Sequence, residues 1–313
     1  MKKITITSNI KEQFKNLVFS VFKKDRNGNL FFEKRKDGKI LFSITLRELN
    51  ELVNKKLKNF DNSINFEKLM TAEFDYLKNL TEYIDKNKEF TKLTEKEKEY
   101  FYTLYERLKK SEFIKLLNVT TCLYCNRNYV FNFKKGKKLK TTAQLDHFYN
   151  KKNYPYLAVS LYNLVPCCST CNLRKSSQKV DIFHPYVDSF DDYAKFTVTI
   201  TNSDFYYSLD GFEIDLEPKQ DFLLNRVRTH IEIFELKDLY KKHKDIVLEL
   251  IKKKYMYQES YLDELLKKYE GTLFKNREDL LRLVSGGYIN EDEINKRPLS
   301  KLIKDISEDL EIF

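Results

Sequence analysis

Glycine, long apolar runs and a secretory leader are scarce or absent in this sequence, and each absence excludes a class of protein. The chain of 313 residues has only seven glycines and no Gly-x-x-x-x-Gly-Lys-Ser/Thr segment, which excludes a nucleotide-binding P-loop. No stretch of about eighteen apolar residues occurs, so we expect no transmembrane helix. Residues 1–7 turn polar before an apolar signal core could form, so we expect a soluble, cytoplasmic protein without disulfides.

Cysteine is also scarce, but four of the five cysteines stand in two Cys-x-x-Cys pairs, Cys122 with Cys125 and Cys168 with Cys171. Each pair supplies two thiolates from one tight turn, which favours a tetrahedral structural Zn²⁺ that joins two distant segments. A set of buried free thiols is the alternative. Cys167 lies beside Cys168 and could replace it as a ligand, although the regular two-residue spacing favours Cys168.

Positive charge is concentrated in the segment that contains these cysteines. The formal net charge is +10, and residues 121–180 contain eleven Lys and Arg side chains against one acid, Asp146. The rest of the chain is neutral, with 46 basic and 46 acidic residues. A Lys-rich composition explains the number of charges but not their localisation. The localisation indicates a polyanionic partner, because phosphate neutralisation supplies much of the affinity for nucleic acid.

The hydrophobic pattern predicts an α+β fold, in which a mostly helical chain carries a central zinc-bound finger and two β-hairpins. Residues 1–120 are expected to be mainly helical, with a hairpin near 29–43 whose turn is Lys36-Asp37-Gly38. Residues 121–190 hold the finger. Residues 191–313 are expected to form a hairpin followed by helices.

The C-terminal pattern is specific enough to predict individual elements. Alternating apolar residues at 196–200 and 205–209 predict the two strands of the second hairpin, with Asp210-Gly211 as a turn. Apolar recurrences three and four residues apart predict helices over 223–239, 246–265 and 299–310. Their Leu and aromatic stripes are typical of a packed core, so we assign these helices to the scaffold.

Candidate catalytic residues lie between the two cysteine pairs. Phosphodiester hydrolysis needs a base for water and a cation that stabilises the developing charge, which Asp146-His147 can supply if Asp146 binds Mg²⁺ and His147 accepts the proton. Asn172, in the first turn of a helix, offers a second ligand to the cation. Lys175 and Arg174 follow one turn along and are expected to contact phosphate. Asn163 is expected to hydrogen-bond the loop that carries His147.

Three stretches of this segment carry a family resemblance. They are Thr121-Cys122-Leu123-Tyr124-Cys125-Asn126, Gln144-Leu145-Asp146-His147-Phe148-Tyr149, and Tyr162-Asn163-Leu164-Val165-Pro166 continuing to Cys171-Asn172-Leu173-Arg174-Lys175. Together they resemble the HNH endonucleases, although Asn172 stands where the name-giving pattern has His. The resemblance implies a ββα-metal finger related to the treble clef. It implies a strand ending at His147, a strand through Leu164 and Val165, and a helix from about Cys171 that grips one divalent ion, Mg²⁺ or Mn²⁺.

The flanks are similar to bacterial HNH proteins of anti-phage systems of the Septu and retron-associated types, through residues 181–190 and 297–302. That similarity implies a bacterial nuclease that acts with a partner ATPase or sensor subunit. We expect double-stranded DNA as the substrate. The expected contacts to nucleic acid are Arg127, Lys137, Lys138, Lys151, Lys152, Arg174 and Lys179.

Two other functions remain open at this point. An RNA- or tRNA-cleaving effector shares the same phosphate chemistry. A non-catalytic zinc-dependent nucleic-acid-binding module would keep the cysteines and lysines but has no use for Asp146, His147 and Asn172 together. His184 is a further candidate site residue by proximity, although a packing role is favoured for it. His230 and His243 lie in helical patterns and are assigned no chemistry.

Overall fold

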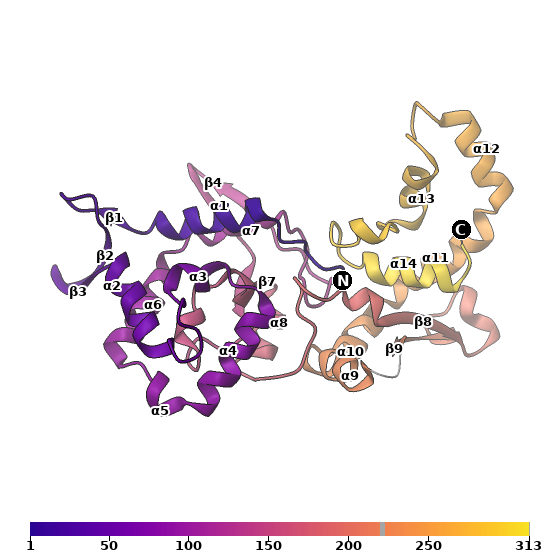
Figure 1. The fold of residues 1–313 in the computed structure, drawn as a ribbon. Helices are drawn as coiled ribbons and strands as arrows, with labels where there is room; N and C mark the ends of the chain where they lie inside the picture. Colours follow the sequence, from indigo (N-terminus) through magenta and orange to yellow (C-terminus); the bar gives the residue numbers. More distant parts are fainter. Residues whose placement is uncertain (220–222, 313) are drawn as a thin grey trace.

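The computed structural model describes residues 1–219 and 223–312, which form helices and four small antiparallel sheets (Figure 1). The N-terminal helices gather on one side of the molecule and the C-terminal helices on the other, and the cysteine-containing segment lies against the N-terminal group (Figure 1). This arrangement agrees with the expected mixture of helices and small sheets. Within the described residues, no helix combines the length and the apolar content needed to cross a membrane.

The predicted N-terminal hairpin is confirmed. β2 (Leu30–Lys36) pairs with β3 (Lys39–Thr45), and a short β1 (Lys23–Lys24) extends the sheet. Asp37 and Gly38 both have positive φ, at 49° and 78°, which is the backbone that a two-residue hairpin turn requires. The helices of this region are α1 (Ser8–Phe19), α2 (Leu46–Leu57), α3 (Phe66–Thr71), α4 (Phe74–Lys86), α5 (Lys88–Thr91), α6 (Glu95–Arg107) and α7 (Lys110–Leu117).

The middle segment contains two strand pairs and one short helix. β6 (Gln144–His147) pairs with β7 (Leu164–Cys167), and α8 (Ser169–Lys175) follows β7. The predicted strands at His147 and at Leu164 are therefore present, and the helix begins two residues before Cys171. A further hairpin of β4 (Asn132–Lys135) and β5 (Lys138–Thr141) was not expected from the sequence.

The second predicted hairpin is only half correct. β8 (Ala194–Ile200) contains the expected first strand, but its partner is β9 (Phe212–Pro218), so residues 205–209 are not a strand. They lie in a loop of 3₁₀ turns at 203–206 and 209–211, where Asn202 and Ser208 side chains accept backbone N–H groups. Phe212, Ile214 and Leu216 are the buried alternating residues instead. Side-chain caps from Asn202 and Ser208 therefore stabilise turns in this segment, although its apolar alternation is typical of a strand.

Two of the three C-terminal helices predicted from periodicity are interrupted, whereas the one predicted over 299–310 is confirmed at Ser300–Asp309. Glu235, with a φ of 48°, separates α9 (Leu224–Ile233) from α10 (Leu236–Tyr240), and residues 257–258 separate α11 (Lys244–Met256) from α12 (Glu259–Tyr269). The predicted start of the first helix falls at Leu223, beside residues 220–222, which lie outside the described part of the chain. Two more helices, α13 (Arg277–Ser285) and α14 (Ser300–Asp309), complete this region.

One cluster of buried apolar side chains draws on all three regions of the sequence, from Phe14 on α1 through Leu164 on β7 to Ile306 on α14. A second, smaller cluster joins α12 and α13 through residues such as Leu262 and Leu280. The cysteine-containing segment is therefore packed into the main core rather than carried as an appendage. This packing fixes the orientation of β6, β7 and α8 relative to the N-terminal helices.

Asn126, directly after the first cysteine pair, attaches the C-terminal segment to this core. It is fully buried, has a φ of 50°, and accepts the backbone N–H of Leu299 on its carbonyl oxygen at 2.7 Å. Its side chain donates to the carbonyl of Ile294 at 2.9 Å and accepts from the N–H of Lys301 at 3.1 Å. If the turn moves, these buried hydrogen bonds are broken, and the donors and acceptors left without partners destabilise the fold by their desolvation cost. The geometry of the first cysteine pair therefore determines how residues 294–301 are held.

Candidate metal centre and active site

The four paired cysteines meet at one buried point. The sulfur atoms of Cys122, Cys125, Cys168 and Cys171 all lie within 4.8 Å of one another. A tetrahedral zinc ion with Zn–S bonds of about 2.3 Å places its sulfurs about 3.8 Å apart. The cluster is therefore compatible with structural zinc, with one ligand pair from the turn before β4 and the other from the start of α8.

The surroundings of the cluster fit bound thiolates. The backbone N–H of Arg127 donates to the Cys125 sulfur at 3.4 Å, and the Asn128 side chain donates to the Cys168 sulfur at 3.3 Å. Donors of this type stabilise the charge on zinc-bound thiolates. Cys167 is fully buried outside the cluster, and burial raises the pKa of its thiol well above the ordinary value. Cys168, and not Cys167, is therefore the fourth member of the set.

Asp146 lies on β6 in a buried polar contact. Its Oδ2 atom accepts the hydroxyl of Tyr124 at 2.7 Å and pairs with the Lys175 ammonium at 3.0 Å. Lys175 is 1% exposed and also donates to the carbonyls of His147 and Phe148, both at 3.0 Å. Breaking such a pair on one side leaves a buried charge that costs about 3–5 kcal/mol. Contrary to the expectation from sequence, Lys175 does not reach outward to phosphate but holds the end of β6.

His147, the last residue of β6, is half-buried and hydrogen-bonded at one ring nitrogen. Nε2 lies 3.0 Å from the carbonyl oxygen of Ala158, and because a carbonyl can only accept, Nε2 carries the proton. Burial lowers the pKa of His147 to about 3, so the ring is neutral near pH 7. Among the described residues, none hydrogen-bonds Nδ1. His147 therefore presents an unprotonated ring nitrogen, which is the form that accepts a proton.

The carbonyl that orients His147 belongs to the loop between β6 and β7, and Asn163 holds this loop. The Asn163 side chain accepts the N–H of Tyr149 at 2.6 Å and donates to the carbonyls of Tyr149 at 3.0 Å and Leu157 at 2.9 Å. Leu157 directly precedes Ala158. Asn163 thus makes the loop contacts that its predicted role requires, through both ends of its amide.

Asn172 on α8 lies over the face of β6 that also carries Asp146. Its amide donates to the Gln144 side chain at 2.6 Å, and Gln144 and Asp146 share a face because side chains alternate along a strand. Within the described residues, Oδ1 of Asp146 receives no side-chain hydrogen bond. Asp146 therefore keeps one carboxylate oxygen without a side-chain partner, while its other oxygen is engaged by Tyr124 and Lys175.

The chain was compared with known proteins. No family model, no curated protein and no solved structure matches it.

The seven residues expected to contact nucleic acid have different surroundings. Arg174 pairs with Glu235, Lys179 pairs with Asp85 at 2.5 Å, and Arg127 donates to a ring nitrogen of His243 at 3.2 Å. The other four, which form no ion pair within the described part of the chain, are Lys137, Lys138, Lys151 and Lys152. The unpaired residues are the stronger candidates, although exposed ion pairs are weak enough for a phosphate to displace the acid.

Tyr105 and Lys110 belong to the surroundings of His147, and the sequence analysis did not single them out. The Tyr105 ring lies 4.4 Å from the His147 ring, and the ammonium groups of Lys110 and Lys151 lie 4.2 and 4.4 Å from the Tyr105 ring. Burial and the charge of Lys151 lower the pKa of Lys110. Both residues come from α6 and α7, far from the motifs in sequence, so only the helical register of Tyr105 in its apolar stripe hinted at an inward position.

His184 is a packing residue in this structure. It is fully buried beside Phe74 and Phe148, its Nε2 donates to the carbonyl of Tyr162 at 2.7 Å, and its Nδ1 accepts the N–H of Tyr186 at 3.2 Å. Both ring nitrogens are thus used in the neutral form. The favoured interpretation of His184 as structural agrees with these contacts.

Lowering the pH below about 6.5 is expected to reduce the stability of the protein because of His184. Burial lowers the pKa of His184 to about 3 in the folded state, against about 6.5 when unfolded, so the unfolded chain binds the extra proton between these values. The free energy of unfolding should therefore decrease by up to about 1.4 kcal/mol per pH unit below pH 6.5 from this residue. Urea unfolding with zinc present, compared between wild type and His184→Phe, measures the difference. An equal pH dependence in both proteins would contradict the assignment.

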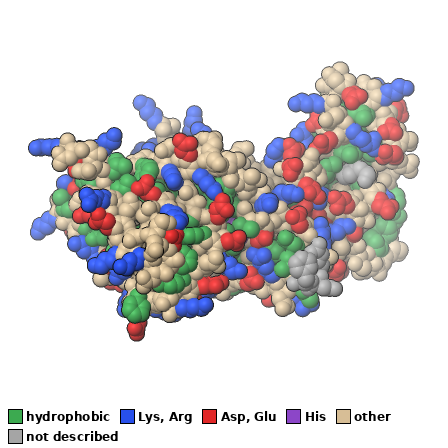
Figure 2. All heavy atoms as spheres, viewed as in Figure 1, with side chains coloured by type: hydrophobic (Ala, Val, Ile, Leu, Met, Phe, Trp, Pro, Cys, Tyr) green, Lys and Arg blue, Asp and Glu red, His purple; other side chains and the backbone are tan. Residues whose placement is uncertain are grey.

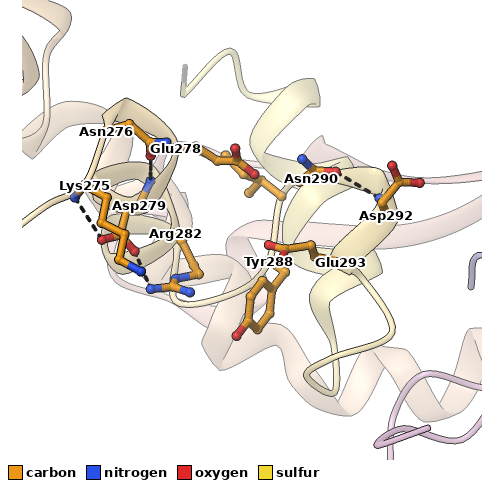
Figure 3. A pocket seen from close by; sticks show the side chains of 10 residues that line it. Lys275, Asn276, Glu278, Asp279, Arg282, Tyr288, Asn290, Asp292 and Glu293 are labelled. Atoms are coloured by element: carbon orange, nitrogen blue, oxygen red, sulfur yellow. Dashed lines mark hydrogen bonds and ion pairs between the residues drawn. The ribbon is translucent and has the colours of Figure 1, made fainter. Parts of the chain in front are cut away.

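The pocket in Figure 3 lies elsewhere, between α13 and residues 288–293. It has a volume of 470 Å³, but its polar side chains are already engaged with one another. Asp279 accepts from Arg282 and from the backbone of Lys275, and Asn290 caps the N–H of Asp292. These contacts account for its polar lining as the caps of a helix and of a turn, so we assign it no chemistry.

Proposed function

We propose that this protein is a metal-dependent endonuclease of the HNH type that hydrolyses phosphodiester bonds in DNA. The observation that carries the proposal is the state of His147. Its Nε2 is tied to the Ala158 carbonyl at 3.0 Å, its Nδ1 is left to accept a proton, and the loop that provides the carbonyl is held by Asn163. His184, in contrast, has both ring nitrogens bonded within the protein. His230 also has an unbonded Nδ1, but it is buried, whereas His147 is partly exposed and can meet a water.

In this proposal Nδ1 of His147 takes a proton from water as the water oxygen attacks phosphorus. The bond from phosphorus to the leaving oxygen breaks, and that oxygen takes a proton from solvent. A divalent cation, Mg²⁺ or Mn²⁺, held by Asp146 and Asn172 would stabilise charge on the phosphate. Lys175 keeps Asp146 in place through the 3.0 Å ion pair. Lys110 and Lys151, which form no ion pair within the described residues, attract the phosphate beside His147.

The supporting role of zinc in the proposal is structural. A zinc ion with four thiolate ligands has no open position for substrate, so the four cysteines hold β7 and α8 against the turn before β4. We further propose that the nuclease serves in bacterial anti-phage defence together with a partner ATPase. The chain contains no P-loop of its own, so an ATP-driven step has to come from another protein.

Two alternatives share part of this support. A non-catalytic zinc-dependent binding module explains the cysteines and the lysines, but it gives no role to a partly exposed His147 whose unbonded ring nitrogen can accept a proton. Cleavage of RNA or tRNA uses the same groups on the protein. An assay that offers both DNA and RNA is therefore needed to distinguish the two substrates.

The test is to incubate the full chain with supercoiled plasmid, single-stranded DNA and tRNA, with and without Mg²⁺ or Mn²⁺. We expect cleavage of DNA that depends on the added divalent ion and stops when only that ion is withheld, because zinc alone does not supply the cation at Asp146. Cleavage restricted to tRNA would replace DNA by RNA as the substrate. If every nucleic acid stays intact with each metal ion and with the partner ATPase present, the protein is not a nuclease.

A further inference from the structure

β4 and the residues that lead into it, 129–131, expose aromatic side chains, and this surface is called here the outer face of the β4–β5 hairpin. Tyr129, Phe131 and Phe133 are 45%, 46% and 46% exposed, and they occupy alternate positions, so they point to the same side. The rings of Tyr129 and Phe131 are stacked, with centroids 4.4 Å apart and planes at 21°. Three neighbouring exposed aromatic rings are an unusual surface for a protein to leave in water, and such patches mark interaction sites.

Lysines accompany these rings along the hairpin. The hairpin carries five lysines, none of which forms an ion pair within the described residues: Lys134, Lys135, Lys137, Lys138 and Lys140. Phe133 lies directly opposite Lys140 in the strand register, so a ring and an ammonium group stand side by side on the outer face. The sequence has no acid between Glu112 and Asp146. Basic side chains project at the top of the molecule where Figure 1 draws β4 (Figure 2).

The hairpin is anchored through its other face, so the aromatic face is free. The Asn132 side chain donates to the carbonyl of Ser111 at 2.9 Å, and the Ser111 hydroxyl donates to the carbonyl of Leu139 at 3.0 Å. Asn132 and Leu139 are only partly exposed. The inward face thus carries polar contacts to α7 while the apolar rings point outward, which is the reverse of what folding alone would favour.

The anchored side of the hairpin connects it to the surroundings of His147. Ser111, which anchors the hairpin, follows Lys110, whose ammonium lies 4.2 Å from the Tyr105 ring that contacts His147. β5 also runs within three residues into β6, the strand that carries Asp146 and His147.

We propose that the outer face of the β4–β5 hairpin binds nucleic acid with unpaired bases, which stack on Tyr129–Phe131 and on Phe133 while the lysines contact phosphates. Bases inside a duplex are covered by their neighbours, so they cannot stack on a protein ring unless the strand is single or opened. The five lysines select a polyanion over an apolar protein partner. That the bound strand is also the substrate rests on the proposed nuclease function. The binding itself can be measured without cleavage.

The experiment measures binding of fluorescently labelled oligonucleotides by anisotropy. The full chain with His147→Ala is used without added divalent ion, so that cleavage cannot interfere. The ligands are a single-stranded DNA, an RNA of the same sequence and the corresponding DNA duplex. The hairpin variant carries Phe131→Ala and Phe133→Ala. The matched control is Phe90→Ala, which removes a ring that is 74% exposed on α5, away from the hairpin.

We expect the hairpin variant to bind single strands at least about tenfold more weakly than its parent, with a smaller effect on the duplex, and Phe90→Ala to bind like its parent. Replacing Lys138 and Lys140 with Gln should weaken binding and reduce its salt dependence by about 0.7 per lost phosphate contact. The DNA and RNA arms show which strand is preferred. Unchanged single-strand binding by a folded hairpin variant, or equal losses for single strands and duplex, would overturn the proposal.

The outcomes also separate this inference from the proposed nuclease activity. If the wild-type protein cuts no substrate but the hairpin variant loses single-strand binding, the binding surface stands and the nuclease proposal fails. If the wild type cuts DNA but the hairpin variant binds and cuts normally, the reverse holds. If the variant keeps nucleic-acid binding but no longer binds the partner ATPase, the aromatic face is a protein-docking surface and the inference is wrong.

Discussion

Replacing His147 with alanine is expected to reduce the rate of DNA cleavage by about 10²–10⁴-fold, the usual contribution of a positioned general base. The ring of His147 is half-buried and oriented by the Ala158 carbonyl at 3.0 Å, so the substitution removes a positioned proton acceptor. The effect should fall on the chemical step, because the lysines that attract phosphate remain. Single-turnover cleavage of a labelled DNA, with substrate binding measured separately, gives both quantities.

His243→Ala is the matched control for this variant. His243 is also a partly buried imidazole whose pKa is lowered by burial, but it lies at the start of α11. Its replacement releases Arg127, which donates to it at 3.2 Å, but removes no proposed catalytic residue. We therefore expect the His243→Ala rate to stay within about twofold of wild type and the protein to fold normally. An Asn163→Ala variant should fall between the two, because it loosens the loop that orients His147. Cleavage by His147→Ala at the wild-type rate would remove His147 from the mechanism.

Replacing Cys171 with serine is expected to remove zinc from the protein and to lower its free energy of unfolding by at least about 3 kcal/mol, since the binding energy of structural zinc is folding energy. Wild type should contain one zinc ion per chain by metal analysis, because four clustered thiols complete one tetrahedral site. Protection of backbone amides at residues 294–301 should also decrease in hydrogen exchange, because Asn126 holds this segment from the turn after Cys125.

Cys167→Ala provides the control for the zinc experiment. Cys167 is buried and adjacent to Cys168 but stands outside the cluster, so its replacement removes a thiol without removing a ligand. We expect Cys167→Ala to keep its zinc and to lose only the small packing energy of one sulfur atom, about 1 kcal/mol. If Cys171→Ser and Cys167→Ala retain equal zinc, or if wild type contains none, the cluster is a set of buried thiols.

Elements with a local cause could be predicted from the sequence. The turn at Asp37 and Gly38 has the positive φ values that these residue types tolerate, and the strand ending at His147 follows the pattern of its motif. Elements that depend on competition between local and distant contacts were missed. Residues 205–209 alternate like a strand but form turns that the Asn202 and Ser208 side chains cap. The β4–β5 hairpin was not predicted, because its lysines give residues 134–140 no apolar alternation.

The functional site shows the same division. Spacing alone identified the four cysteines, because two Cys-x-x-Cys turns have few uses other than a metal. The roles proposed for Asp146, His147, Asn163 and Asn172 rest on residue type and on the resemblance. Spacing could not show that Lys175 is buried against Asp146, or that Tyr105 and Lys110 surround His147 from another part of the chain.

The sequence by itself determined which residues could bind metal and where the positive charge lies, since both follow from residue identity and short spacings. Only the tertiary structure decided which ring nitrogen of His147 is unbonded, which lysines are neutralised by acids, and which face of the β4–β5 hairpin is exposed. The physical reason is that protonation, ion pairing and exposure depend on neighbours brought together by the packed core. Tyr105 is 42 residues from His147 in the chain, and yet their rings are in contact.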